Sequence, residues 1–216
     1  MINTNQMIVD KYIAQLEKLN STFSDDCLEL VINKEWKKIS PSLQIIYCGD
    51  NPGKREKESN QYFKGYAGNE LNDFVELHQK INNVTETAFF NKTPFYSTKT
   101  SDLTKSLDKH NNEVIKQSIR LTLQCLYDLW IANDKKLQLI FFGVNEKAYI
   151  VKTFKEILID EFNEFSQQVT ILNHPSHNSL YAEIGKTVLK ELTQQDNLNI
   201  TFQELVEKTQ RHWFDK

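Results

Sequence analysis

Four short apolar runs alternate with helical patterns along this chain, and the alternation limits the possible folds more than any other feature. The runs occupy residues 43–48, 86–91, 137–142 and 169–172. Between the runs, apolar residues recur at helical spacing. Strands that alternate with helices are joined by crossover connections, which produce a parallel sheet covered on both faces. The sequence therefore predicts an α/β fold, a three-layer αβα sandwich with a central four-stranded parallel sheet.

The length of 216 residues fits one domain of ordinary size. We expect N-terminal helices in residues 1–40, a core in 41–195 and a C-terminal helix in 196–216. The second N-terminal helix is predicted from the apolar spacing of Leu28–Ile39. Thr201–Glu204 has the capping-box pattern of a helix start, which supports the C-terminal helix.

Composition and charge narrow the class of protein. The formal net charge of −3 argues against a large non-specific nucleic-acid surface and leaves room for a local basic rim. Cys27, Cys48 and Cys125 are too few and too widely spaced for a disulfide framework or a metal site, so no metal or other cofactor is expected. No apolar run approaches the roughly 18 residues of a membrane helix, and the N-terminus lacks a signal pattern. We expect a cytoplasmic monomer with no membrane partner.

Each predicted strand ends in a polar turn. The turns are Gly49–Gly53 (Gly-Asp-Asn-Pro-Gly), Asn91–Pro94 (Asn-Lys-Thr-Pro), Gly143–Asn145 (Gly-Val-Asn) and Asn173–Ser176 (Asn-His-Pro-Ser). The carboxyl ends of parallel strands meet at one edge of the sheet, and open α/β sheets bind their ligands there. The functional site is therefore predicted at this edge.

The turns and one further segment together resemble the uracil-DNA glycosylase superfamily. Gly49–Gly53 looks like the Gly-x-Asn-Pro-Gly motif of its mismatch-specific and single-strand-selective branches. Tyr62–Gly68 resembles the Phe-x-Gly-x-x-Gly stretch of its iron–sulfur branch. Asn91 looks like the base-reading Asn of the family, and His174–Ser176 is similar to its closing motif. The resemblance covers about residues 40 to 195 and implies a DNA-base glycosylase of base excision repair.

The chain also departs from the family pattern. Three scattered cysteines cannot supply the four ligands of the iron–sulfur branch. Asp50 adds an unusual charge to the first turn. The DNA wedge of the family, often a Leu, falls here at His177 or Asn178, which argues against efficient penetration of duplex DNA.

The resemblance implies specific roles for the turn residues. A glycosylase takes the nucleotide out of the stack, holds its base and stabilises the departing negative charge. Phe63 would stack on the base, and the Asn91 amide would match uracil O4 and N3–H. Asn51 would orient the attacking water, because a carboxamide is no general base, and His174 would donate to uracil O2. The remaining residues expected around the base are Gly49, Asp50, Pro52 and Gly53.

Gly53 stands where the best-known branch has a bulky Tyr that excludes a 5-methyl group. We therefore expect 5-substituted uracils to be accepted unless another side chain fills the gap. A basic and hydroxylated rim is predicted to contact DNA. Its residues would be Lys92, Lys99, Ser176, His177 and Asn178.

The leading interpretation is a uracil-DNA glycosylase with a monofunctional hydrolytic mechanism, since no Lys occupies a motif position that suggests a Schiff base. Each site residue also has a purely structural alternative, and for Asp50 we favour a turn-stabilising role. A catalytically silent module that binds a nucleobase or single-stranded DNA stays open. A nucleotide-binding α/β enzyme is disfavoured, because the Gly-rich fingerprints of such enzymes are missing.

Overall fold

The computed structural model describes residues 2–22, 28–97, 103 and 109–174. Its helices are α1 (Thr4–Thr22), the 3₁₀ helix η1 (Lys34–Lys38), α2 (Lys54–Ser59), α3 (Tyr66–Asn82), α5 (Lys109–Ala132), α6 (Tyr149–Glu161) and α7 (Asn163–Ser166). Its strands are β1 (Ile45–Gly49), β2 (Thr87–Asn91), β3 (Gln138–Phe142) and β4 (Val169–Leu172). The predicted C-terminal helix in 196–216 lies outside the described residues.

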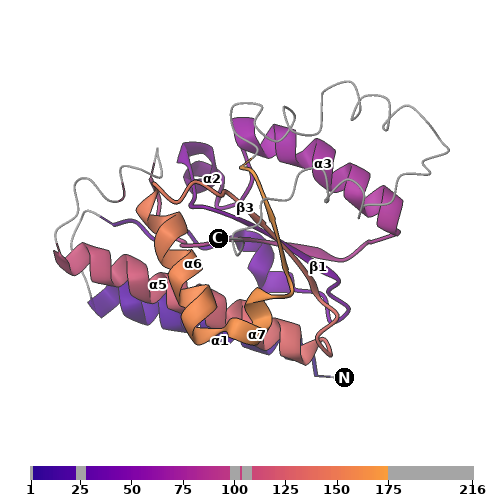
Figure 1. The fold of residues 1–216 in the computed structure, drawn as a ribbon, viewed down its shortest axis with the longest axis horizontal. Coiled ribbons are helices and arrows are strands. Elements are labelled where there is room, and N and C mark those ends of the chain that lie inside the picture. The colour runs from indigo at the N-terminus through magenta and orange to yellow at the C-terminus, as the bar shows by residue number, and fades with distance from the viewer. Residues whose placement is uncertain (1, 23–27, 98–102, 104–108, 175–216) are drawn as a thin grey trace.

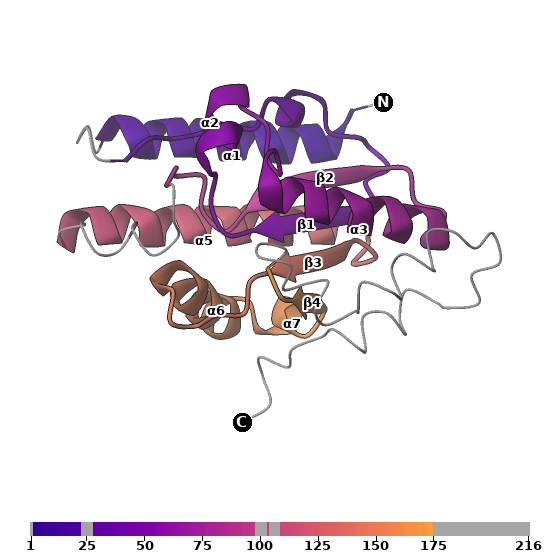
Figure 2. The same ribbon diagram turned by 90° about the horizontal axis from the view of Figure 1, so that it is seen from above.

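The four strands form one parallel sheet in the order β2-β1-β3-β4. They fall on the four apolar runs, so the predicted α/β class and the parallel sheet are confirmed. Helix α3 lies on one side of the sheet, and α1, α5 and α6 lie on the other (Figures 1 and 2). No helix among the described segments is long and apolar enough to cross a membrane.

The face of the sheet toward α3 is built from aromatic rings. Tyr47 of β1 stacks between Phe89 of β2 and Phe142 of β3, with ring centroids 5.6 and 6.4 Å away. The Tyr47 hydroxyl is 2.6 Å from Nδ1 of His78, a fully buried residue of α3. Burying each such ring contributes about 1.5–3 kcal/mol, so this row fixes β1, β2 and β3 against α3.

The opposite face packs on α1, α5 and α6. Phe90 of β2 stacks on Trp36 of η1 at 4.9 Å, and Phe141 of β3 meets Phe154 of α6 at 5.2 Å. Side chains alternate between the faces of a strand. Gly49 and Asn91 therefore share the α3 face with Tyr47 and Phe89, while Lys92 follows Phe90 toward α6. The alternation therefore places Gly49 and Asn91 on one face of the sheet and Lys92 on the other.

The second N-terminal helix predicted over Leu28–Ile39 is wrong. Only Lys34–Lys38 is helical, as the single 3₁₀ segment η1. The residues before it are extended, because their backbone bonds to distant parts of the chain. The Val31 N–H donates to the Pro94 carbonyl at 3.0 Å, and the Tyr62 hydroxyl donates to the Val31 carbonyl at 2.8 Å.

Candidate active site

Three of the predicted site residues meet at the end of β1. Gly49 is in register with Asn91 of β2. A Cβ atom at position 49 would lie 2.6 Å from Asn91 Oδ1 and 2.9 Å from Cζ of Phe63. No side chain fits in that space. The glycine therefore lets the amide of Asn91 and the ring of Phe63 approach the same point of the backbone.

Asn91 carries a buried polar atom without a partner. The residue is 3 % exposed, and its Nδ2 has no hydrogen bond to any residue that the structure describes. Leaving a buried donor unpaired costs about 1–3 kcal/mol, and folded proteins rarely accept that cost without a reason. A ligand that lies beside Phe63 and accepts a hydrogen bond from Asn91 Nδ2 would offset this cost.

The loop that carries Phe63 is built around an unusual backbone conformation. Phe63 has a φ of +55°, a left-handed value that costs a non-glycine residue about 1–3 kcal/mol. Gly65 follows with a φ of +116°. A Cβ at Gly68 would overlap the Phe63 carbonyl oxygen, so only glycine fits there. Both glycines of the Phe-x-Gly-x-x-Gly pattern are therefore required by one loop conformation. That conformation directs the Phe63 ring toward Gly49.

Glu56 of α2, which the sequence analysis missed, holds this loop to the first turn. Its Oε1 accepts the Phe63 N–H at 2.5 Å, and its Oε2 accepts the Gly53 N–H at 2.6 Å. Burial raises the pKa of the Glu56 carboxyl, while the two backbone N–H groups act to lower it. The Gly53-x-x-Glu56 spacing, which suits a glutamate that reaches back to a helix start, was the available signal.

Asn51 ties the first turn to the segment after β2. Its Nδ2 donates to the carbonyl of Ser97 at 3.1 Å and to that of Pro52 at 3.1 Å. The Ser97 N–H in turn donates to the Pro52 carbonyl at 3.1 Å. The amide nitrogen of Asn51 is thus used within the protein.

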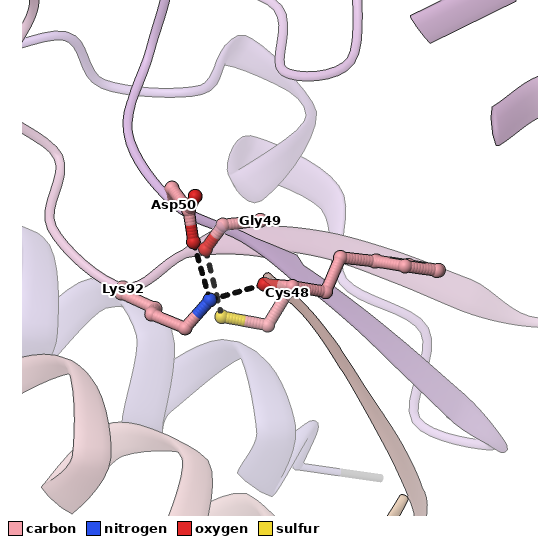
Figure 3. A network of polar contacts seen from close by, with 5 residues as sticks. Cys48, Gly49, Asp50 and Lys92 are labelled. Atoms are coloured by element: carbon pink, nitrogen blue, oxygen red, sulfur yellow. Dashed lines mark hydrogen bonds and ion pairs between the residues drawn. The ribbon is translucent and has the colours of Figure 1, made fainter. Parts of the chain in front are cut away.

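Asp50 and Lys92 form an ion pair below the same turn (Figure 3). Lys92 is fully buried, and its Nζ lies 2.5 Å from Asp50 Oδ1. The same ammonium donates to the carbonyl of Phe142 and sits 5.7 Å from the ring of Phe154. A Cβ at Gly143 would lie 2.5 Å from Asp50 Oδ1, so the carboxylate rests against a glycine. The pair joins the carboxyl ends of β1, β2 and β3.

This burial corrects one prediction and supports another. The predicted contact between Lys92 and DNA phosphates is wrong, because the ammonium lies inside the protein and is already paired with a carboxylate. The turn-stabilising role favoured for Asp50 fits the geometry. The other predicted DNA contacts, Lys99, Ser176, His177 and Asn178, lie outside the described residues.

His174 lies two residues beyond the end of β4 and is half-buried. Strand β4 is separated from β1 by β3. His174 therefore stands at the predicted edge of the sheet, on the far side of β3 from Gly49.

A family model described as the uracil DNA glycosylase superfamily matches residues 36–196. This chain belongs to that superfamily. No curated protein matches it. The matched segment contains every site residue named above, from Gly49 to His174, so the resemblance seen in the motifs is confirmed.

The superfamily assignment gives a context to the residues at the edge of the sheet. An enzyme that binds an extruded base needs a flat surface for the base and a polar group that reads its edge. A ring and a buried amide are the kinds of group that lie together at this edge. Among the described residues, no three His, Cys, Asp or Glu side chains are grouped closely enough to hold a metal ion. The polar side chains placed at or next to this edge are the amides of Asn51 and Asn91, the carboxylates of Asp50 and Glu56, the Lys92 ammonium and His174.

Proposed function

We propose that this protein is a DNA-base glycosylase that hydrolyses the N-glycosidic bond of uracil, or of a closely related pyrimidine, in DNA. The observation that carries the proposal is the buried Asn91 amide: its Oδ1 and the Phe63 ring approach the same point at Gly49, and its Nδ2 has no hydrogen-bond partner among the described residues. A buried donor without a hydrogen bond, at the sheet edge where α/β folds bind ligands, would gain a partner from a substrate that brings an acceptor.

Uracil supplies such a partner. With its ring against Phe63, its O4 would accept from Asn91 Nδ2 and its N3–H would donate to Asn91 Oδ1. Cytosine has an amino group in place of O4 and no hydrogen on N3, so the same amide would face the wrong groups. A site with buried polar atoms rejects such a mismatch strongly, because its own atoms stay unpaired.

In the proposed reaction, the C1′–N1 bond breaks and its electron pair leaves with the base. His174 would donate a hydrogen bond to uracil O2, where the negative charge builds. Water would add its oxygen to C1′ and release a proton to solvent. Asn51 would orient that water through its carbonyl oxygen, which positions the nucleophile without acting as a base.

A monofunctional mechanism has support from the position of Lys92. A Schiff-base lyase needs an unprotonated amine that reaches C1′ of the sugar. The Lys92 amine is fully buried and paired with Asp50.

The contacts of Asn51 favour a second candidate, a silent module that binds a nucleobase or single-stranded DNA. The Asn51 side chain is tied to Ser97 and Pro52, as a residue with a purely structural role would be. Such a module would keep the pairing of Asn91 with a base and lack turnover.

The test is a panel of oligonucleotides that contain uracil, single-stranded or mismatched, with wild type, Asn51→Ala, Asn91→Ala and His174→Ala. We expect wild type to release uracil and each variant to be slower by at least about tenfold, the loss expected for one positioned hydrogen bond. Free uracil is assayed in parallel by isothermal titration calorimetry. Uracil binding without cleavage would favour the silent module, and neither binding nor cleavage would reject the glycosylase and the module that binds a nucleobase.

A further inference from the structure

Because Lys92 is buried, the cations that contact DNA must be other residues. Three exposed basic residues of the described structure lie next to the candidate site. They are Lys54 and Arg55 of α2, and Lys64 in the loop before α3. We propose that these three side chains form the rim that contacts the DNA backbone, here called the α2 rim. The inference rests on the proposed function, since it takes DNA as the partner.

The position of the α2 rim follows from the chain itself. Lys54 directly follows Gly53, and Lys64 directly follows Phe63. Glu56 bonds both Gly53 and Phe63 through their N–H groups, so the two lysines start from neighbouring points of the backbone. Phosphates on either side of a nucleotide whose base rests on Phe63 would meet these residues first.

Arg55 is fixed in this place by packing. A Cβ at Gly65 would lie 3.4 Å from Cδ of Arg55 and 3.7 Å from its Cβ, so the aliphatic stem of the arginine covers the glycine. A stem already held against the protein loses less conformational entropy when its end binds a ligand. The guanidinium suits phosphate, because its planar fork donates two parallel hydrogen bonds.

Neighbouring charges leave the α2 rim positive. Both oxygens of the Glu56 carboxylate accept backbone N–H groups, so in the structure they are not paired with Lys54, Arg55 or Lys64. Lys57 of the same helix is paired with Glu29 at 2.5 Å and lies 4.7 Å from the Tyr96 ring. Glu58 is the exposed acidic residue of α2. With a net charge of −3 for the whole chain, a local cluster of three cations gives DNA a defined side of approach.

The α2 rim is tested by the salt dependence of DNA binding. The probe is a short fluorescein-labelled duplex with one tetrahydrofuran abasic site, which a glycosylase cannot hydrolyse. Affinity is measured by fluorescence anisotropy over a series of salt concentrations. Each phosphate contact makes the slope of log K against log salt more negative by about 0.9 for duplex DNA. We expect Lys54→Ala, Arg55→Ala and Lys64→Ala each to make the slope less steep by about 0.9.

Two controls make the result specific. Lys136→Ala removes an exposed lysine just before β3, at the opposite edge of the sheet, and should leave the slope unchanged. Arg55→Lys keeps the charge and most of the stem and should retain the wild-type slope. Slopes of the three rim variants equal to that of Lys136→Ala would overturn the proposal.

The outcome does not depend on catalysis. A protein that binds the probe through the α2 rim and releases no base would refute the glycosylase and leave the rim supported. A protein that cleaves uracil and whose rim variants keep the full slope would refute the rim alone. Failure of wild type to bind both this probe and a labelled single strand of the same sequence at any salt concentration would also overturn the rim.

Discussion

Lys92 Nζ lies 2.5 Å from Asp50 Oδ1, and each of these residues is the chain neighbour of a candidate site residue. Asp50 precedes Asn51, and Lys92 follows Asn91. The ion pair thus links the turn after β1 to the end of β2 from beneath, on the side of the sheet opposite the Asn91 amide. Its removal should disturb the candidate site without touching a ligand.

The first prediction concerns the stability of this pair. Asp50→Ala leaves a buried ammonium without its carboxylate, which costs about 3–5 kcal/mol in the free energy of unfolding. Lys92→Met in the same chain removes that ammonium. We therefore expect Asp50→Ala/Lys92→Met to be more stable than Asp50→Ala alone, as measured by urea unfolding. Lys92→Met alone completes the cycle, and a loss in the double variant equal to the sum of the losses in Asp50→Ala and Lys92→Met would mean that the two charges do not interact.

A second prediction concerns Gly49. An alanine Cβ there would meet Asn91 Oδ1 at 2.6 Å and the Phe63 ring at 2.9 Å. Gly49→Ala should lower the unfolding free energy by about 1–3 kcal/mol and weaken uracil binding, because the reader and the ring are pushed apart. Gly53→Ala is the comparison, since its Cβ would meet only the end of Glu56, at 3.3 Å. Equal stability of Gly49→Ala and wild type in thermal unfolding would argue against this packing.

A third prediction concerns Glu56. The amide of Glu56→Gln has one acceptor oxygen, so one of the two N–H groups of Gly53 and Phe63 loses its partner. We expect a loss of about 1–3 kcal/mol in stability and faster hydrogen exchange at one of those two amides by NMR. Glu58→Gln, on the same helix and exposed, serves as the control and should change neither. Unchanged exchange at both amides in Glu56→Gln would show that the carboxylate does not hold them.

A fourth prediction concerns the C5 side of the base. Gly53 has no side chain, and Glu56 Oε2 occupies part of the space beyond it. Because position 53 carries no ring, 5-hydroxymethyluracil should be released at a rate within about tenfold of uracil, the scale of one modest steric contact. Gly53→Tyr should reduce release of 5-hydroxymethyluracil more than release of uracil. An activity panel in which wild type cleaves uracil and leaves 5-hydroxymethyluracil intact would contradict this prediction.

The strand-end site was open to prediction because it depends on local signals. Four apolar runs gave the four strands, and parallel strands bring their carboxyl ends to one edge. Phe63 and Asn91 were found through short motifs, and their shared contact with Gly49 gives those motifs a steric meaning. The glycine at position 49 is thus both part of the sequence motif and a requirement of the packing between Asn91 and Phe63.

Features that depend on distant partners were missed. Lysine is usually a surface residue, and the carboxylate partner of Lys92 lies 42 positions earlier in the chain. Leu28–Ile39 has helical spacing, but the Val31 N–H bonds to the Pro94 carbonyl, and that long-range contact outweighs local propensity. Neither outcome is encoded within a window of neighbouring residues.

The last prediction concerns the pH dependence of stability through His78. Burial lowers the pKa of this imidazole to about 3, although a hydrogen bond with Gln138 acts to raise it. The unfolded chain takes up the proton near pH 6.5, while the folded protein stays neutral there, so stability falls as the pH drops from about 6.5 toward 3. From pH 6.5 to pH 5 this residue should remove about 1.5 kcal/mol. Urea unfolding of His78→Gln at the two pH values should show a loss smaller by that amount. An identical loss in wild type and His78→Gln would mean that His78 is protonated as readily in the fold as outside it.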